Sequence, residues 1–134
     1  MDAMLSKYQP IALSLFRFII GLLLFQYGVA KILGFPVVPM FAKLPPLIQV
    51  AGWIELVLGA LLLIGLFTRI VAFILSGEMA CAYFLGHMFK NPEQPQFLPL
   101  LNGGTAAIAF CFACLYLATA GPGPISVDAK MGRS

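Results

Sequence analysis

Four long apolar runs constrain this chain more than any other feature of its sequence. They cover residues 11–33, 47–67, 70–89 and 97–120. An α-helix needs about 20 predominantly apolar residues to cross the hydrocarbon core of a bilayer, and each run reaches that length. We therefore predict an all-α membrane protein in which four transmembrane helices form an antiparallel bundle, with residues 1–134 as a single domain.

The composition favours the same class. Hydrophobic residues make up 61% of the chain and charged residues only 10%, whereas soluble domains carry about a quarter charged residues. The net charge of +3 is modest and the basic residues are scattered, so no nucleic acid is expected as a partner. The expected surrounding of this chain is the lipid bilayer.

The stretches between the runs are rich in helix breakers, except between the second and third runs. There only Thr68 and Arg69 intervene, which predicts a tight antiparallel hairpin whose two helices touch. The first run is longer than the apolar core of a secretory signal and is interrupted by Arg17, so we expect it to be retained as a span.

Four crossings would place both chain termini on one side of the membrane. Lys and Arg residues on that side outnumber those on the other side five to three. The positive-inside rule then predicts cytoplasmic termini. The expected membrane is the inner (cytoplasmic) membrane of a bacterium. The five are Lys7, Arg17, Arg69, Lys130 and Arg133, and the three are Lys31, Lys43 and Lys90.

Small residues recur at heptad spacing and predict the faces on which the helices meet, because membrane helices associate through close packing of small side chains. In the first two runs the ionisable residues share these faces, so we expect them to point toward protein. The predicted faces are Ser14, Arg17, Gly21, Leu24, Gly28 and Lys31 in the first run, Gly52, Glu55, Gly59 and Leu62 in the second, and Gly104, Ala107, Cys111, Cys114 and Ala118 in the fourth.

Two ionisable residues lie at similar depths in the first and third runs. Measured from the terminal side by helical rise, Arg17 lies at roughly 9 Å and Glu78 at roughly 12 Å. An ionisable group costs at least about 2.5–3.5 kcal/mol at the bilayer centre and is normally paired or faces a cavity. We therefore predict an ion pair between Arg17 and Glu78. Such a pair either only holds the helices together or belongs to a site.

Glu55 lies deeper, at roughly 18 Å on the same scale, nearer to Gln26, Tyr27 and Lys31. Those three residues are candidate binding contacts for a polar head group. Glu55 and Glu78 are candidates for proton exchange, with helix packing as the alternative role for both.

His87 is the only histidine and lies near the outer end of the third run. It is a candidate to hydrogen-bond a quinone carbonyl or to relay protons, and a simple hydrogen-bonding role at the interface is the alternative. Because neither a second His nor a Cys lies at matching depth, no metal or haem site is expected. Cys111 and Cys114 form a C-x-x-C, but both lie in the middle of a run, where packing explains them better than thiol redox chemistry does.

Together these features resemble the DoxX family of small four-helix membrane proteins. The resemblance rests on the order and spacing of five segments, and one departure is Thr105, where the family often has Glu. The segments are R-F-I-I-G-L-L-L-F-Q-Y-G-V-A-K (17–31), G-W-I-E-L-V-L-G-A-L-L-L-I-G-L-F-T-R (52–69), G-E-M-A-C-A-Y-F-L-G-H (77–87), N-G-G (102–104) and G-P-G-P-I-S-V-D-A (121–129).

The resemblance implies which polar positions matter. The family's recurrent polar residues fall on Arg17, Lys31, Glu55, Glu78 and His87. The N-G-G segment adds a further candidate binding residue, Asn102.

The family takes its name from a subunit of a thiosulfate:quinone oxidoreductase, and relatives are linked to thiol and sulfur redox complexes. The resemblance therefore implies an integral membrane subunit of a redox system, associated with a quinone. Because the sequence contains no flavin, haem or dinucleotide motif, electrons would come from a soluble or membrane redox partner protein. The alternatives are a non-catalytic scaffold or assembly factor, and a component of small-molecule transport that would need a homo-oligomer.

Overall fold

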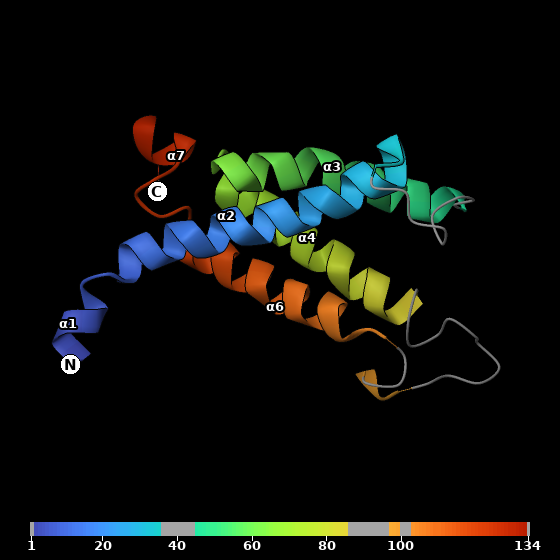
Figure 1. Ribbon diagram of the computed structural model, residues 1–134, viewed down its shortest axis with the longest axis horizontal. Coiled ribbons are helices and arrows are strands. Elements are labelled where there is room, and N and C mark those ends of the chain that lie inside the picture. Colours follow the sequence, from blue (N-terminus) through green and yellow to red (C-terminus); the bar gives the residue numbers. More distant parts are fainter. Residues whose placement is uncertain (1, 36–44, 86–96, 100–102, 134) are drawn as a thin grey trace.

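The computed structural model describes residues 2–35, 45–85, 97–99 and 103–133, and every secondary-structure element within these ranges is a helix (Figure 1). The elements, in chain order, are α1 (Asp2–Ser6), α2 (Gln9–Gly28), the π-helical turn η1 (Val29–Leu33), α3 (Pro46–Ile64), α4 (Thr68–Tyr83), α6 (Thr105–Ala120) and α7 (Val127–Lys130).

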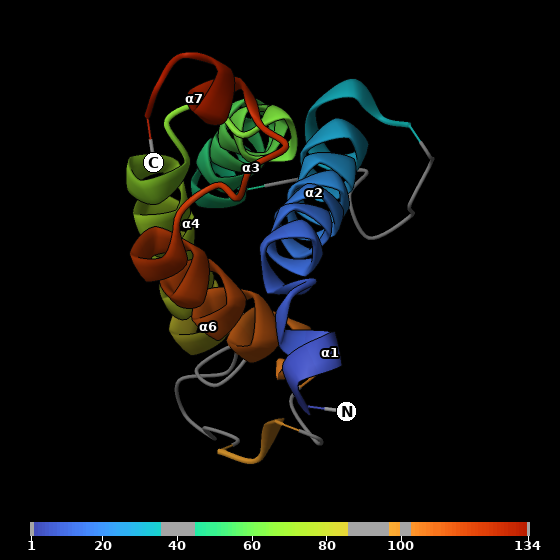
Figure 2. The same ribbon diagram turned by 90° about the vertical axis from the view of Figure 1, so that its left-hand side faces the viewer.

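The longer helices pack in two pairs, α2 against α3 and α4 against α6 (Figures 1 and 2). Further contacts between α3 and α4 and between α2 and α6 join the two pairs. Each of the four helices contributes one leucine with no exposed surface to the common core, namely Leu24, Leu62, Leu75 and Leu117. Both termini lie at the same end of the structure (Figure 1).

Glycines bring the backbones of α2 and α3 into close contact. A Cβ atom on Gly21 would lie 2.5 Å from the backbone nitrogen of Leu63, and one on Gly59 would lie 2.7 Å from that of Phe25. The predicted faces of these two helices are confirmed, since the side chains buried in α3 are the predicted set, and five of the six buried in α2 were predicted. Small residues at these positions let the helices approach more closely than larger side chains would permit.

Outside the core the structure presents apolar side chains. Phe18 and Leu22 on α2, Trp53 on α3, Phe73 on α4 and Phe112 on α6 are all exposed. The helix formed by α2 with η1, and α3, are long and apolar enough to cross a membrane, and α6 is apolar but shorter. Water-soluble proteins rarely expose apolar surface on this scale, so the outer face of these helices suits lipid.

The hairpin between α3 and α4 forms as predicted, because the two helices touch, but the predicted position of the turn is wrong. Gly65 ends α3 in the left-handed conformation, with φ of 76°. Phe67 is also left-handed, with φ of 54°, an uncommon conformation for a residue with a large side chain. Thr68 and Arg69, predicted to be the link, form the first turn of α4.

The helix within the fourth apolar run also begins later than predicted. Gly103 adopts a positive φ of 74°, and α6 starts at Thr105 rather than at Phe97. A glycine in this conformation interrupts a helix without the steric cost that other residues would incur. The last four residues of the predicted third run, 86–89, lie outside the described residues.

Candidate functional site

An ion pair between Lys31 and Glu55 lies where η1 meets α3. The Lys31 Nζ atom is 2.9 Å from Oε1 and 3.0 Å from Oε2 of Glu55, so the ammonium group contacts both carboxylate oxygens. The side chain of Glu55 is 2% exposed, and that of Lys31 is 15% exposed. This pair joins two helices that both carry the predicted small-residue faces.

Glycines on both helices create the room for this ion pair. A Cβ atom on Gly52 would lie 2.9 Å from Cβ of Lys31. A Cβ atom on Gly28 would collide with the backbone nitrogen of Leu56, the residue after Glu55. The two backbones therefore approach at the depth of Glu55, which brings the base of the Lys31 side chain within reach of the carboxylate.

Glu78, on α4, lies next to this pair. Its carboxyl group lies close enough to Glu55 and Lys31 to interact electrostatically with both. Both carboxylate oxygens of Glu78 are buried and have no hydrogen-bond donor among the described residues. Two carboxyl groups can hydrogen-bond to each other only when one of them holds a proton. The geometry therefore places two acids and one base around a position that calls for a proton or a donor ligand.

The remaining predicted contacts divide into those the structure brings near this cluster and those it does not. The Tyr27 ring lies 5.8 Å from the Lys31 Nζ atom and makes an edge contact with Phe110 at 6.2 Å. Gln26 is exposed on the surface of α2. His87 and Asn102 lie outside the described residues.

The predicted ion pair between Arg17 and Glu78 is wrong. Arg17 instead donates hydrogen bonds from Nη1 to the carbonyl oxygens of Pro122 at 2.6 Å and Ile125 at 3.0 Å, and from Nη2 to that of Leu63 at 3.3 Å. Similar depth in the membrane did not imply contact, because the chain after α6 folds back and supplies these carbonyl groups. Arg17 is nevertheless buried, as its place on the predicted face required.

The segment that folds back is the G-P-G-P-I-S-V-D-A sequence after α6, and it lies over the end of the α3–α4 hairpin (Figure 2). Ser126 caps α7 by accepting a hydrogen bond from Ala129 N at 3.0 Å. Asp128 accepts hydrogen bonds from the backbone nitrogens of Phe67 and Thr68, each at 2.9 Å, and its own N–H donates to the Gly65 carbonyl at 2.9 Å. The segment therefore fastens the turn between α3 and α4.

Asp128 is the residue that sequence reasoning missed. Burial alone would raise the pKa of its carboxyl group, but the backbone N–H groups of Thr68 and Phe67 and the nearby charge of Arg133 lower the pKa below its ordinary value. The available signal was a helix-capping serine followed two residues later by an acid, shortly after a Gly-Pro-Gly-Pro segment.

The three cysteines lie on α4 and α6. Ser76 Oγ donates a hydrogen bond to the Cys111 carbonyl oxygen at 2.8 Å, which links the two helices. Cys114 is buried in the core, Cys111 is half-buried, and Cys81 is exposed. All three are free thiols.

Comparison with known proteins identifies relatives along nearly the whole chain. Residues 12–88, more than half of the sequence, match the model of the family described as DoxX. The chain is also 40% identical over 129 residues to a protein of Haemophilus influenzae described as uncharacterized, and the match covers 94% of this chain and 95% of that protein. No solved structure matches the chain.

Proposed function

The chain belongs to the DoxX family of membrane proteins, and from that premise we propose that it is an integral membrane subunit of a redox system. Its proton-exchanging site would be the cluster of Lys31, Glu55 and Glu78. This proposal concerns one transmembrane domain in which α2, α3, α4 and α6 cross the bilayer as an antiparallel bundle. By helical rise α6 is roughly 24 Å long, shorter than a hydrocarbon core of about 30 Å, a difference that local thinning of the bilayer can accommodate.

The orientation that we propose follows from charge. Most Lys and Arg residues lie on the side of the termini, which favours cytoplasmic termini in a bacterial cytoplasmic membrane. Lys31 and Glu55 would then lie toward the outer leaflet, since η1 is at the end of α2 away from the N-terminus (Figure 1).

One observation carries the functional proposal, namely the buried carboxyl pair beside a single lysine. Without a proton, Lys31, Glu55 and Glu78 would together hold one excess negative charge in the low-dielectric interior, where an uncompensated charge is costly. A proton shared by the two carboxyl groups neutralises the cluster. Two neighbouring carboxylates repel each other, so the pair is suited to take up and release a proton.

The cluster also fits the head group of a quinone. Quinone oxygens accept hydrogen bonds, and the cluster offers two donors, the Lys31 ammonium group and the protonated carboxyl group. A quinone would supply the electron-carrying chemistry, and a partner redox protein would supply the electrons. The protonated carboxyl would donate to a quinone oxygen, and Lys31 would balance the carboxylate that remains.

The test is a titration of the purified protein with a short-chain quinone analogue, followed by calorimetry. We expect saturable binding by the wild type and at least about tenfold weaker binding by Glu78→Gln, since one well-placed hydrogen bond to a charged or strongly polar group is worth about 1.5–3 kcal/mol. Ser76→Ala is the matched control, because it removes another polar group of α4 that points at α6. Equal affinity of the wild type and a Glu55→Gln/Glu78→Gln variant would refute the site.

A non-catalytic scaffold or assembly factor is the second candidate, and the contacts of Arg17 favour it. Among the described residues Arg17 donates its hydrogen bonds only to backbone carbonyl groups, which is a structural role. If the whole polar interior serves packing, substitutions of Glu55 and Glu78 will change expression and thermal stability and leave quinone-analogue binding undetectable in every variant.

A further inference from the structure

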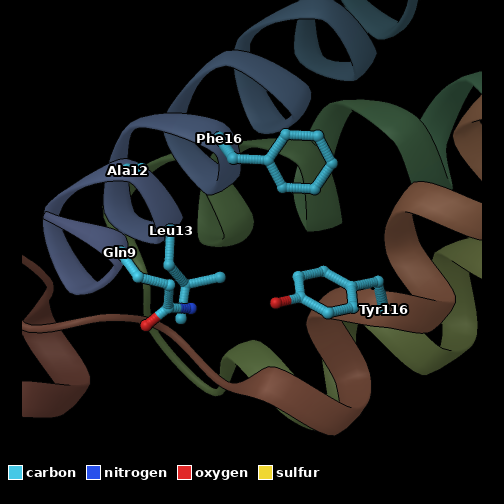
Figure 3. Close-up of a pocket in the computed structure, with 5 residues that line it drawn as sticks. All are labelled: Gln9, Ala12, Leu13, Phe16 and Tyr116. Atoms are coloured by element: carbon cyan, nitrogen blue, oxygen red, sulfur yellow. The ribbon is translucent and has the colours of Figure 1, made fainter. Parts of the chain in front are cut away.

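A groove runs between α2 and α6 at the end of the structure where the termini lie (Figure 3). Its volume is about 210 Å³, and apolar side chains form most of its lining. The walls are the rings of Phe16 and Tyr116, which meet edge-on at 6.3 Å, together with Ala12 and Leu13. This groove is the apolar part of a larger surface feature.

A second, basic pocket adjoins the groove, since both are lined by Gln9 and Leu13. Its volume is about 310 Å³, and its lining includes the guanidinium-bearing residues Arg69 and Arg133 and the tail residues 122–124. The two pockets are therefore neighbours, and we refer to them together as the depression, with a cationic end and an apolar end.

The cationic end is held in place by the fold. Arg69 donates hydrogen bonds to the carbonyl groups of Ala118 and Thr119 at the end of α6, and the lack of a side chain on Gly121 lets the guanidinium lie against that glycine. The Arg133 guanidinium lies over the ring of Phe67, with 4.7 Å between its Cζ atom and the ring centroid.

The charge that Arg133 carries is only partly compensated. Its nearest carboxylate, Asp128, is 3.8 Å away and already accepts two backbone hydrogen bonds. Arg69 lines the same pocket and adds a second guanidinium group to the cationic end.

The cationic and apolar ends of the depression also lie at the depths expected for the head group and the acyl chain of an amphiphile. Its cationic end lies at the first residue of α2 and the last residue of α6, where helices leave the hydrocarbon core. Phe16 is seven residues further along α2 than Gln9, which is roughly 10 Å deeper by helical rise. Across the groove the Tyr116 hydroxyl points toward Leu13 and Gln9 (Figure 3).

We propose that this depression binds one anionic phospholipid from the leaflet on the side of the termini. The phosphate would lie against Arg69 and Arg133, and an acyl chain would lie against Leu13 and Phe16. Arginine forks suit phosphate oxygens, and anionic lipids are drawn to basic residues next to membrane helices. The proposal is independent of the redox function.

The charges of the described residues favour a lipid over a second copy of the protein in this place. A second copy would have to offer a carboxylate to the cationic end. Among the described residues Asp2 is the one exposed acid, since Glu55 and Asp128 are buried and the carboxylate oxygens of Glu78 are buried as well.

The experiment compares dioleoyl phosphatidylglycerol with dioleoyl phosphatidylcholine, using native mass spectrometry of the full chain in detergent. We expect the first phosphatidylglycerol molecule to bind at least about tenfold more tightly than phosphatidylcholine. Arg133→Gln should lower the affinity for phosphatidylglycerol about fivefold, the effect of one basic residue near a lipid surface. Lys130→Gln, which removes a neighbouring charge that does not line the pocket, should leave the affinity unchanged.

The apolar end has its own matched pair of variants. Phe16 and Phe18 are 38% and 39% exposed, but only Phe16 lines the groove. Phe16→Ala should weaken the binding of both lipids at least about threefold, through the loss of buried apolar area, and Phe18→Ala should not.

Several results would overturn the proposal. These are equal affinity for the two lipids, equal losses in Arg133→Gln and Lys130→Gln, or displacement of phosphatidylglycerol by inorganic phosphate at millimolar concentration. A dimer that forms in lipid-free detergent and that Phe16→Ala dissociates would assign the groove to a second copy instead. Because Arg133 contacts the fold less than Arg69 does, its variant should fold, and a circular dichroism spectrum matching that of the wild type verifies this.

Discussion

Two polar regions of this protein are built from the same kinds of residue and differ in how completely their polar groups are satisfied. At the end with the termini, Arg17 and Asp128 each contact backbone groups of other segments, and together they fasten the tail to the α3–α4 hairpin. At the other region, Glu78 lies beside Glu55 and Lys31 with both carboxylate oxygens lacking a donor among the described residues.

The difference shows how a buried charge can be assigned a role. Ionisable residues within a membrane segment are candidates for function by default. Arg17 shows that such a residue can instead have a structural role. Its two terminal nitrogens donate hydrogen bonds to three carbonyl groups, and only Nε lacks a partner among the described residues. Glu78 retains its hydrogen-bonding capacity, and that capacity is what a proton or ligand can use.

The largest effect on stability is expected for Arg17→Leu. The substitution leaves the carbonyl groups of Leu63, Pro122 and Ile125 without their charged donor, and the free energy of unfolding should fall by about 3 kcal/mol or more. Thermal unfolding in detergent measures the change, with the exposed Lys7→Leu as the control. Similar melting temperatures for Arg17→Leu and the wild type would show that the tail is not fastened in this way.

A double-mutant cycle then tests whether the two regions are separate. Arg17→Leu combined with Glu78→Gln should change the free energy of unfolding by the sum of the single effects, within about 0.5 kcal/mol. Partial recovery of stability in the double variant would instead support the direct ion pair between Arg17 and Glu78 that the sequence analysis predicted.

The two regions also differ in how far sequence reasoning reached. The apolar runs and glycine spacing predicted the longer helices and the buried faces of α2 and α3, because the periods of a helix are local properties of the sequence. Lys31 was only placed nearer to Glu55 in depth, and the ion pair between them was not predicted. The depth of a residue in the membrane does not determine how one helix is rotated against another. For that reason Arg17 was wrongly predicted to pair with Glu78.

The tail could not be predicted because its contacts join residues far apart in the chain. Arg17 hydrogen-bonds to the Pro122 carbonyl and Phe67 N–H hydrogen-bonds to Asp128, and the packing of the helices brings these distant residues together. The turn at Gly65 was likewise misplaced by three residues, since hydrophobicity continues through Leu66 and Phe67 and hides the left-handed glycine that ends α3.

The next largest effect concerns the close approach of α2 and α3 beside the carboxyl cluster. Gly28→Ala places a methyl group against the backbone of Leu56 and should destabilise the protein by about 1–3 kcal/mol. Gly77→Ala is the matched control, because no atom lies within 4 Å of the added Cβ there. The control should be neutral or stabilising, since alanine favours a helix. Equal loss of stability in both variants would show that the close contact of Gly28 with α3 is not the cause.

Asp128→Asn should cost about 1–2 kcal/mol at neutral pH, because the amide accepts the two backbone hydrogen bonds less well than the carboxylate does. The pKa of Asp128 is lower in the folded than in the unfolded state, so its stabilising contribution is present above the unfolded value of about 4 and is lost as pH falls through the folded value. Melting temperatures from pH 7 down to pH 3 should converge for wild type and variant. Parallel curves over that range would contradict the role of Asp128.

The smallest effect on stability is expected for Glu78→Gln. The substitution keeps the size of the side chain and removes an acid that has no donor among the described residues, so the free energy of unfolding should change by less than about 1 kcal/mol, in either direction. A loss of about 3 kcal/mol, equal to that of Arg17→Leu, would show that Glu78 contributes to stability as much as Arg17 does and would contradict the proposed difference between the two regions.

Infrared difference spectroscopy of the carboxyl groups tests the proton-sharing cluster most directly. At neutral pH the wild type should show the carbonyl stretching band of one protonated carboxylic acid, shifted by exchange into deuterated water. The band should vanish in Glu78→Gln and in Glu55→Gln, because a single remaining carboxylate pairs with Lys31, and it should persist in Asp128→Asn. A wild-type spectrum in which every carboxyl group is ionised at neutral pH would contradict the account.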